Sequence, residues 1–281
     1  MDGFGPLVDA DWLARHLGEP DLVVADVRWN LAESGPADYR DGHIPGAVFV
    51  DLHTDLAGPR RPGTGRHPLP DPEAFAASMA GLGIGDRTRV VAYDDAGGSI
   101  AARLWWMLEV TGRGAALLDG GLRAWAEPLE TGFVTPKAGT TFTPRPWPRD
   151  LIVDVDDVER VRHDPAVALL DARAPQRYRG ESEPLDTRAG HIPGARNATW
   201  RENLDPATDR FRSPDELRAW FASLGADRAG EVVASCGSGV TACHEIVALR
   251  LAGIAARLYP GSWSEWIADP ERPIAVGDAP G

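Results

Sequence analysis

The chain has 281 residues and carries 29 Lys and Arg against 42 Asp and Glu, which gives a formal net charge of −13. A charge this negative argues against a nucleic-acid or acidic-membrane partner, and 43% hydrophobic residues are typical of a globular protein with a sizeable core. The sequence has no apolar run long enough to span a membrane, and residues 1–25 show no signal-peptide pattern, so we expect a cytoplasmic protein.

The first half of the chain alternates short apolar runs with helical patterns. Residues 22–27 and 89–93 are rich in β-branched side chains and predict buried strands, and residues 71–83 (DPEAFAASMAGLG) predict a helix. The motif GHIPGA stands at 42–47, and LLDGGLRAW at 117–125. Residues 135–150 then contain four prolines and predict a semi-rigid linker that runs over the surface.

The second half repeats the first in the same order. Strands are predicted at 167–170 and 231–235, and GHIPGA returns at 190–195. The helix expected at 213–225 has Ser213 as N-cap, Glu216 at the capping-box position and Gly225 at its end. Equivalent residues lie 141 to 148 positions apart, for example His43 and His191. We therefore expect two copies of one domain, residues 1–134 and 151–281, joined by the linker 135–150.

Alternating strands and helices predict the architecture of each copy. The fold class is α/β, and each copy should form an open, mainly parallel sheet with helices on both faces. Ligands of such sheets bind beyond the carboxyl ends of the strands. The loops that follow the predicted strands are therefore where functional residues are expected.

The strongest chemical signal is the loop after the strand 231–235. Cys236 follows that strand, Gly237 and Gly239 flank Ser238, and a helical pattern begins at Thr241. Glycines let successive amide N–H groups turn inward as an anion-binding nest, and the start of a helix adds positive potential. Both favour the thiolate, the nucleophilic form of cysteine. We interpret Cys236 as a nucleophile, with a small buried hydrophobe as the alternative.

The equivalent loop of the first copy lacks a cysteine. YDDAGGSIAAR, at 93–103, places Asp94 or Asp95 at that position. Because a carboxylate cannot perform thiolate chemistry, we expect the second copy to be active and the first to support it, with the aspartate bonding its own loop amides. The other cysteine, Cys243, lies inside the predicted helix and is expected to fill the core.

The residues of this loop also indicate which thiol reactions are unfavourable here. A cysteine-dependent phosphatase needs an arginine at the far end of the loop, and residues 236–242 contain no cation. A cysteine hydrolase needs a histidine base, and His244 is expected to sit on the helix and point away. Phosphoryl transfer and hydrolysis are therefore disfavoured.

The motifs taken together resemble a known family. CGSGVTAC after a strand, GHIPGA in each half, DAR at the end of a strand and YPGSWSEW near the C-terminus resemble the tandem-domain rhodanese sulfurtransferases, over about residues 5–270. The resemblance implies two rhodanese-like domains, of which the first is inactive. It implies a cysteine that takes a sulfane sulfur as a persulfide and passes it to a thiol such as thioredoxin, to a low-molecular-weight thiol or to cyanide. It implies no metal and no organic cofactor.

The loop sequence also bears on the donor. Thiosulfate-preferring members carry basic residues just after the cysteine, whereas CGSGVT is similar to the 3-mercaptopyruvate sulfurtransferases, whose donor is a monoanion held by arginines outside the loop. A neutral Gly237 and Ser238 offer no compensation to a doubly charged donor that enters a partly desolvated pocket. We expect mercaptopyruvate as donor. Thiosulfate is the alternative, and a non-catalytic persulfide carrier or regulatory module is the alternative of another class.

The resemblance assigns roles around the cysteine. Cys236 matches the persulfide-forming residue, and Ser238 matches a serine that works with a first-domain histidine in proton relay, for which His43 is the candidate. The alternative is that His43 and His191 only fix the turn of each GHIPGA motif. The backbone amides from Gly237 to Thr241, which include those of Gly239 and Val240, match the cradle that stabilises the thiolate and persulfide in that family.

The resemblance also assigns arginines to the donor carboxylate. Arg177 matches the first of them; Arg173 or Arg179 could share the task, or be a structural ion pair and a solvated charge. Where the mercaptopyruvate enzymes carry a second arginine, just after a Glu-Pro, this chain has Leu185. Arg188 is the nearby candidate to replace it.

We expect different roles for two tryptophans near the C-terminus. Trp266 has a counterpart in Trp125 of the first copy and is expected to pack in the core. Trp263 has no such counterpart and is a candidate for lining the substrate pocket.

Overall fold

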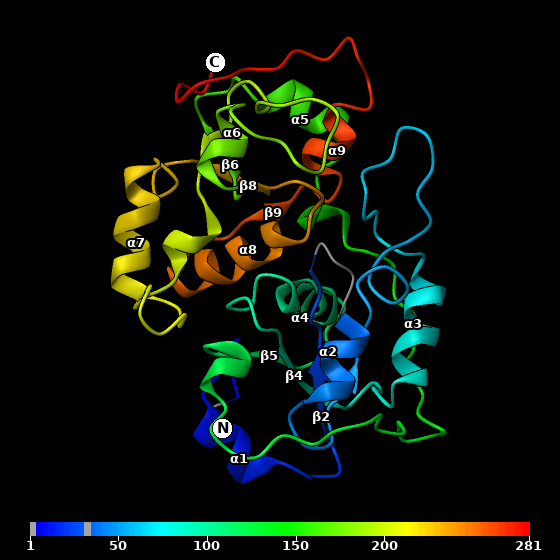
Figure 1. Ribbon diagram of the computed structural model, residues 1–281. Coiled ribbons are helices and arrows are strands. Elements are labelled where there is room, and N and C mark those ends of the chain that lie inside the picture. The colour runs from blue at the N-terminus through cyan, green and yellow to red at the C-terminus, as the bar shows by residue number, and fades with distance from the viewer. Residues whose placement is uncertain (1–3, 31–34) are drawn as a thin grey trace. The chain divides into compact units, whose positions relative to one another are not determined.

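The computed structural model describes residues 4–30 and 35–281 and divides into two compact units (Figure 1). The first unit comprises Met1–Gly58, Leu69–Pro148 and Pro206–Arg210, and the second comprises Pro59–Pro68, Arg149–Asp205 and Phe211–Gly281. Each unit thus includes a short segment whose place in the sequence lies within the other repeat. The linear boundaries expected from the repeat did not anticipate these two segments.

The described residues of the first unit contain a five-stranded sheet in which every neighbouring pair is parallel, in the order β1-β5-β4-β2-β3. β2 and β4 pair along their whole length, from Leu22 opposite Arg89 to Asp26 opposite Tyr93. The strands are β1 (Leu7–Val8), β2 (Leu22–Asp26), β3 (Val48–Phe49), β4 (Arg89–Tyr93) and β5 (Ala115–Leu118).

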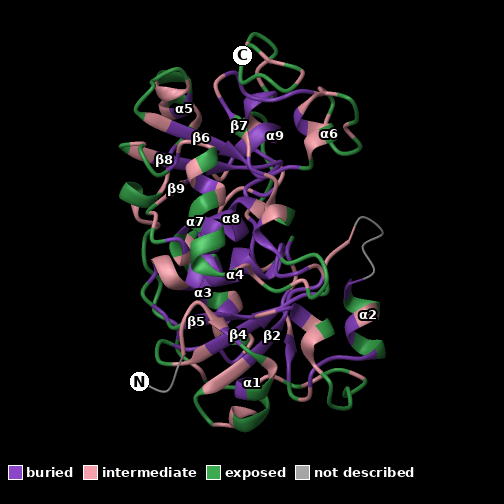
Figure 2. Ribbon diagram, turned by 90° about the vertical axis from the view of Figure 1, so that its left-hand side faces the viewer, coloured by how far each residue is buried: buried purple, intermediate pink, exposed green. Residues whose placement is uncertain are grey.

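Helices cover both faces of this sheet. The first unit has α1 (Ala10–His16), α2 (Gly35–Asp41), α3 (Pro72–Gly81), α4 (Ala101–Val110) and the 3-10 helix η1 (Gly121–Ala124). Asp9 and Asp71 begin α1 and α3 by accepting backbone hydrogen bonds within the first turn. Figure 2 shows α1 on one side of β2, β4 and β5, with α3 and α4 on the other.

In the second unit the described residues form a parallel sheet in the order β7-β6-β8-β9. β6 and β8 pair from Val167 opposite Glu231 to Asp171 opposite Ser235, so both central strands end at the same edge. Asp171 and Cys236 are therefore neighbours at the carboxyl edge, where such sheets bind ligands. The strands are β6 (Val167–Asp171), β7 (Arg196–Asn197), β8 (Glu231–Ser235) and β9 (Arg257–Leu258).

Two cores lie on the two faces of this sheet. Successive strand residues point to opposite faces, so Leu169 and Val233 join one core while Leu170 and Val232 join the other. α5 and α9 contribute to the first core, and α7 and α8 to the second (Figure 2). The helical elements of this unit are η2 (Arg149–Leu151), α5 (Val155–Val161), α6 (Pro175–Tyr178), η3 (Trp200–Asn203), α7 (Pro214–Ser223), α8 (Thr241–Leu251) and α9 (Ser262–Trp266).

The predicted α/β fold is confirmed in each unit, and so are several local features. The backbone N–H of Ser213 donates to Glu216 at 3.0 Å and that of Glu216 donates to the Ser213 hydroxyl at 3.4 Å, which is the predicted capping box of α7. Gly225, just past the end of α7, has the positive φ of 79° expected there.

The proline-rich segment has few regular contacts but is fixed to the first unit at identifiable points. The backbone N–H and hydroxyl of Thr143 donate to Asp86 at 2.9 and 2.6 Å. These bonds and the nearby Arg113 guanidinium hold the pKa of the Asp86 carboxyl down at about 2. The indole N–H of Trp147 donates to the carbonyl of Pro70 at 2.8 Å. These hydrogen bonds hold residues 135–148 against the first unit.

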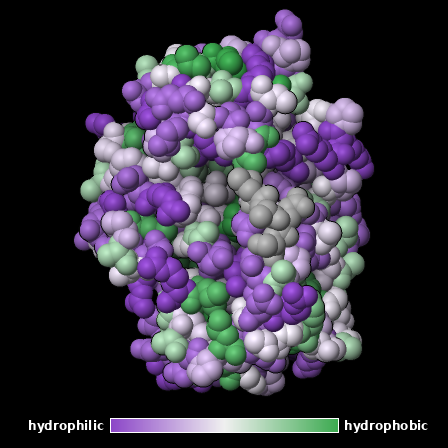
Figure 3. Space-filling model, viewed as in Figure 1, coloured by the Kyte–Doolittle hydropathy of each residue, from purple (hydrophilic) through white to green (hydrophobic). Residues whose placement is uncertain are grey.

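The surface is largely polar. On the face drawn in Figure 3, hydrophilic residues predominate and apolar ones form small separate patches. Large apolar side chains that are exposed include Leu129, Phe133 and Leu185. Within residues 4–30 and 35–281, no helix has the length and apolar character needed to cross a bilayer.

Candidate active site

Cys236 lies between the end of β8 and the beginning of α8, as predicted. The residue is only 2% exposed. Gly239 completes the turn with φ +77°, and a Cβ at that position would lie 2.3 Å from the carbonyl oxygen of Pro260. Only glycine fits this conformation and this space. The loop therefore turns tightly around the cysteine sulfur.

A backbone amide and a serine hydroxyl lie close to the sulfur. The backbone N–H of Gly239 donates to Cys236 Sγ at 3.1 Å, and the Ser262 hydroxyl lies 4.0 Å from Sγ. Ser262 is one of the described non-glycine residues with a positive φ, 52°, and its hydroxyl also accepts the Cys236 N–H at 3.0 Å. The Ser262 hydroxyl donates its proton to the carbonyl oxygen of Tyr259 at 2.8 Å, so the Gly239 N–H, at the beginning of α8, is the donor that reaches Sγ.

Two backbone hydrogen bonds from the beginning of α9 hold the cysteine loop. The backbone N–H of Trp263 donates to the carbonyl of Cys236 at 3.0 Å, and that of Ser264 donates to the carbonyl of Gly237 at 2.9 Å. These bonds engage the carbonyls of Cys236 and Gly237. The predicted cradle of amides from 237 to 241 has its observed bond to Sγ at Gly239.

The first unit provides an internal comparison for this loop. Asp94 directly follows β4 just as Cys236 directly follows β8, which settles the alternative between Asp94 and Asp95. Its carboxylate accepts four loop amides, at 2.7 to 2.9 Å, from Ala96, Gly98, Ile100 and Ala101. The prediction that this aspartate bonds its own loop amides is confirmed.

Ser238 has a histidine partner, but it is not the predicted one. His67 Nδ1 lies 2.8 Å from Ser238 Oγ, and both residues are buried. His67 belongs to the segment Pro59–Pro68, which is part of the second unit. Sequence reasoning missed it because GHIPGA drew attention to His43. A signal existed: His67 lies between GHIPGA and the helix at 72 in the first repeat, and the matching stretch of the second repeat, residues 192–213, contains no histidine.

His43 is instead a structural residue of the first unit. Its ring stacks on Tyr39 with centroids 4.1 Å apart, and its Nδ1 lies 2.9 Å from the Tyr39 carbonyl oxygen. His191 repeats this arrangement with Tyr178, at 3.7 and 2.8 Å. The assignment of His43 to Ser238 is therefore wrong on geometry, and the alternative, that both histidines fix their own turns, describes the structure.

Arg173 is also structural. Its guanidinium forms a bidentate pair with Asp171, donates to the carbonyl of Gly190 at 2.7 Å and is almost fully buried. The first unit contains the same arrangement in Arg28 and Asp26, where no cysteine is present. Because the copy without a cysteine keeps the pair, we interpret Arg173 as a residue that fixes the strand end.

Arg177 lies at the cysteine loop, and Arg188 does not. Arg177 pairs with Glu183 at 2.7 Å and with Asp186 at 3.3 Å, and its Nη2 would lie 3.4 Å from a Cβ on Gly237. The guanidinium of Arg188 instead rests on carbonyl oxygens of the chain after α9, at 3.4 to 3.5 Å. The expectation that Arg188 replaces the missing arginine is not supported by its position.

The remaining predicted residues lie in the core or on the surface. Trp263 is 1% exposed, packs in the α5–α9 core and stacks under Arg173, so its predicted place in a pocket lining is wrong. Trp266 is buried in the same core, and Cys243 is fully buried with Sγ 3.3 Å from the Gly239 carbonyl, as predicted. Arg179 forms ion pairs with Glu181 and Asp278 near the surface.

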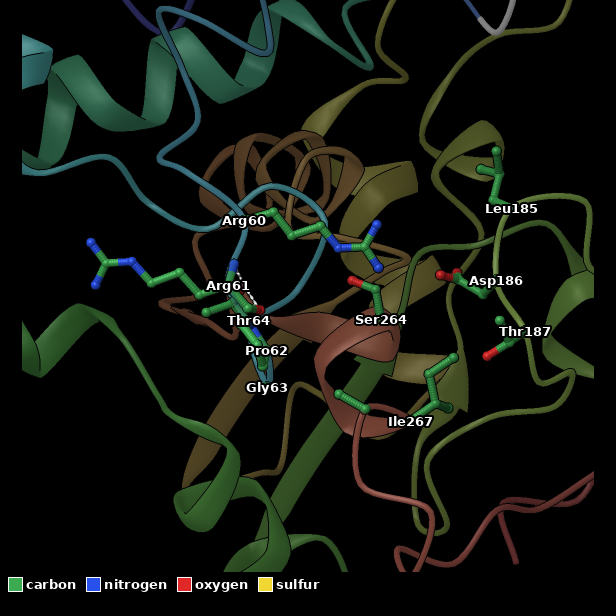
Figure 4. Close-up of a pocket in the computed structure, with 11 residues that line it drawn as sticks. Arg60, Arg61, Pro62, Gly63, Thr64, Leu185, Asp186, Thr187, Ser264 and Ile267 are labelled. Atoms are coloured by element: carbon green, nitrogen blue, oxygen red, sulfur yellow. Dashed lines mark hydrogen bonds between the residues drawn. The ribbon is translucent and has the colours of Figure 1, made fainter.

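A pocket of about 400 Å³ lies beside the loop within the second unit (Figure 4). Ser264, which holds the carbonyl of Gly237, and Asp186, which pairs with Arg177, are both in its lining. Figure 4 shows the Arg60 guanidinium extending toward Ser264 and Asp186, while Arg61 points away from them. The pocket therefore adjoins residues that contact the cysteine loop or its neighbour Arg177.

Comparison with known proteins agrees with this site. Residues 9–128 and 154–269 each match the model of the Rhodanese-like domain. A protein of Pseudomonas aeruginosa named as a probable 3-mercaptopyruvate sulfurtransferase is 48% identical, over 97% of this chain and 98% of its own length. A Mycobacterium tuberculosis protein, provisionally named a thiosulfate sulfurtransferase, is 42% identical over 97% and 98%.

A solved structure of similar fold supports the same family assignment. The crystal structure of SseA from Escherichia coli, described as a 3-mercaptopyruvate sulfotransferase, superposes with a TM-score of 0.79 at 35% identity, covering 92% of this chain and 99% of that one. The chain thus belongs to the rhodanese-like family. Within it, the chain is a sulfurtransferase with two tandem domains.

Proposed function

We propose that the chain transfers a sulfane sulfur from 3-mercaptopyruvate, through a persulfide on Cys236, to a thiol or to cyanide. The observation that carries the proposal is the position of Cys236 Sγ, which accepts the Gly239 N–H at the beginning of α8 beside a Ser238–His67 pair. This arrangement supplies a stabilised thiolate and a proton relay on adjacent residues of one loop.

In the proposed cycle, the Cys236 thiolate attacks the sulfur atom of mercaptopyruvate. The carbon–sulfur bond breaks, its electron pair stays on carbon as the enolate of pyruvate, and the sulfur remains on Cys236. The proton of the donor thiol, relayed through the Ser238 hydroxyl and His67, completes pyruvate and leaves an anionic persulfide. An acceptor thiolate then attacks the outer sulfur, and Cys236 leaves as thiolate.

The Gly239 amide has the same task in each half of this cycle. Its N–H points at Sγ, where negative charge resides before the first transfer and again after the second. A backbone donor fixed by the loop needs no reorganisation as the charge returns. Asp94 supports this assignment, since the equivalent loop of the first unit directs four amides at the oxygens of one side chain.

Mercaptopyruvate is the proposed donor because the charges that face the loop come from outside it. Gly237 and Ser238 are neutral, and Arg177 is positioned to hold a carboxylate while the sulfur faces Cys236. The relative from Pseudomonas aeruginosa bears the name of this activity. Thiosulfate is the second candidate, since the relative from Mycobacterium tuberculosis bears that name.

We further propose that the acceptor is a low-molecular-weight thiol or a protein dithiol such as thioredoxin, and that transfer takes place in the cytoplasm. Both cysteines are free thiols, and cytoplasmic reductants keep acceptor thiols reduced. Comparing turnover with reduced thioredoxin and with a small thiol at equal thiol concentration would identify the acceptor class. Turnover with neither would contradict this part of the proposal.

Steady-state sulfur transfer to cyanide tests the donor and the nucleophile together. We expect kcat/KM to be higher for mercaptopyruvate than for thiosulfate, and Cys236→Ser to abolish both activities. Cys243→Ala is the matched control, because that thiol packs in the core, and should retain transfer. A higher kcat/KM for thiosulfate would overturn the donor. Absence of transfer from either donor would overturn catalysis and favour a persulfide carrier.

A further inference from the structure

Ser264, the third residue of α9 (Figure 4), bonds both segments that bring Ser238 and His67 together. Its backbone N–H donates to the carbonyl of Gly237 at 2.9 Å, and its hydroxyl accepts the backbone N–H of Arg66 at 3.0 Å. All five residues belong to the second unit. Ser264 is 6% exposed, so both bonds are largely screened from water. One residue therefore bonds the residue before Ser238 and the residue before His67.

The orientation of the Ser264 hydroxyl is fixed by its own hydrogen bonds. A hydroxyl has one proton and two lone pairs. The proton is donated to the carbonyl of Gly261 at 3.2 Å, which leaves a lone pair to accept the Arg66 N–H. Gly65 packs against the same place, since a Cβ there would lie 2.6 Å from the Gly261 carbonyl oxygen and 3.1 Å from Ser264 Oγ. A glycine at 65 therefore lets the chain approach closely enough for the bond from Arg66.

The two bonds of Ser264 restrict the distance between Ser238 and His67. Consecutive Cα atoms are about 3.8 Å apart, so holding Gly237 and Arg66 leaves little freedom to the residues that directly follow them. Ser238 Oγ and His67 Nδ1 lie 2.8 Å apart, although the two residues are 171 positions apart in the chain. Their contact therefore depends on tertiary bonds of the kind that Ser264 makes.

We propose that Ser264 is a positioning residue for proton transfer, whose hydroxyl holds His67 at Ser238 by accepting the Arg66 N–H. This rests on the proposed function, in which Ser238 and His67 relay the proton of the donor thiol. Without the hydroxyl, the Arg66 N–H loses this acceptor and the residue before His67 is less constrained. The bond from Ser264 to Gly237 is made by the backbone and survives substitution, so side-chain variants at 264 affect the His67 side alone.

The test compares substitutions at Ser264 that differ in the hydroxyl. Ser264→Ala removes it, and Ser264→Thr and Ser264→Val have the same shape but only the threonine variant retains it. The measured quantity is the rate constant of pyruvate release from mercaptopyruvate in a single turnover without acceptor, a step that uses the proton relay. We expect this rate constant to be about tenfold lower in Ser264→Ala than in wild type, and about tenfold lower in Ser264→Val than in Ser264→Thr. The second comparison holds even if Ser264→Ala fails to fold.

Two further measurements separate positioning from a general loss of structure. In a His67→Gln background, the substitutions at Ser264 should change the rate constant by less than about twofold, because the residue through which Ser264 acts is absent. Alkylation of Cys236 by iodoacetamide, which needs no proton relay, should stay within about threefold of wild type in every variant. Thr111→Val is the matched control: it removes a buried hydroxyl that donates to a main-chain carbonyl of the first unit, and should leave pyruvate release unchanged.

The His67 imidazole gives a readout that needs no sulfur donor. In protein labelled with isotope-enriched histidine, its NMR resonance is assigned by its absence in His67→Gln. We expect this resonance to shift in Ser264→Val and to stay close to its wild-type position in Ser264→Thr. If it does so while mercaptopyruvate yields no pyruvate, the positioning role stands and the proposed function fails.

Three results would overturn the role of Ser264. The first is an unchanged His67 resonance in Ser264→Val. The second is an equal loss of pyruvate release in the wild-type and His67→Gln backgrounds, or a matching loss in Thr111→Val, because Ser264 would then contribute only to stability. The third is a parallel loss of Cys236 alkylation, because the effect would then lie in the cysteine loop.

Discussion

Asp94 and Cys236 stand at the same position of two related loops, and only Cys236 offers a thiol at that position. The carboxyl oxygens of Asp94 accept hydrogen bonds from four loop amides, and burial raises the pKa of this carboxyl. Cys236 places a sulfur at the equivalent position, where the Gly239 amide donates to it. The same loop backbone thus supports an acceptor side chain in one unit and the reacting sulfur in the other.

His67 is the residue whose replacement should most affect the chemical step. We expect His67→Gln to lower kcat for sulfur transfer from mercaptopyruvate by about 100-fold, because the relay partner of Ser238 is lost. His43→Gln should leave kcat within about threefold but lower the melting temperature, since His43 stacks on Tyr39 and bonds its carbonyl. Steady-state kinetics and thermal unfolding of both variants distinguish the two roles, and the reverse ranking of kcat would contradict the reassignment.

Two glycines of the cysteine loop should respond differently to alanine. At Gly237 the added Cβ meets the ends of flexible arginine side chains, so Gly237→Ala should raise KM for mercaptopyruvate severalfold with little change in stability. At Gly239 it meets backbone of Pro260 at 2.3 Å with a positive φ, so Gly239→Ala should cost about 1–3 kcal/mol or more of stability. Equal loss of stability in both would contradict this geometry.

At the scale of elements, α8 carries the cysteine loop on its N-terminal end and a buried acid in its first two turns. Burial raises the pKa of Glu245 to about 8; the hydrogen bond from Asn203 opposes this, and the charges of Asp171 and Cys236 add to it. Since the folded state holds the Glu245 proton up to about pH 8 and the unfolded state releases it near pH 4.5, folding binds one proton between these values.

Glu245 therefore predicts a pH dependence of stability. The free energy of unfolding should fall as pH rises from about 5 to about 9, by a few kcal/mol from this residue alone. Glu245→Gln, which is neutral at both pH values, should flatten the profile and be more stable than wild type at the higher pH. Urea unfolding at both pH values measures this. A wild-type slope in the variant would show that Glu245 is ionised in the folded protein.

Several elements could be predicted from the sequence because their causes are local. The buried strands at 22–27 and 231–235, the capping box at Ser213 and the turn at Gly225 each follow from side chains within a few residues. The cysteine loop belongs with them, since a strand, two glycines and a helix start are contiguous in the chain. The two tryptophans of α9 show what the sequence does not predict. Trp263 and Trp266 both pack in the core, and only the three-dimensional packing reveals this for Trp263.

At the scale of the molecule, the two units do not follow the sequence repeat strictly. The segment Pro59–Pro68 lies in the second unit and supplies Arg66 and His67, while Pro206–Arg210 lies in the first. The sequence marks His67 as a histidine without a counterpart in the second repeat, but no periodic pattern or motif marks the exchange of segments, so its contact with Ser238 could not be predicted. The sequence repeat produces two equivalent loops. The segment Pro59–Pro68 supplies the histidine that contacts the loop with the cysteine.

The persulfide itself is the most direct test of this account. The protein is incubated with mercaptopyruvate in the absence of acceptor, and the intact mass and the peptide that carries Cys236 are measured before and after cyanide is added. We predict a gain of one sulfur atom on Cys236, formed with one equivalent of pyruvate and lost on cyanide treatment, and no gain in Cys236→Ser. Pyruvate release without sulfur on Cys236, or sulfur carried on Cys243, would contradict the account.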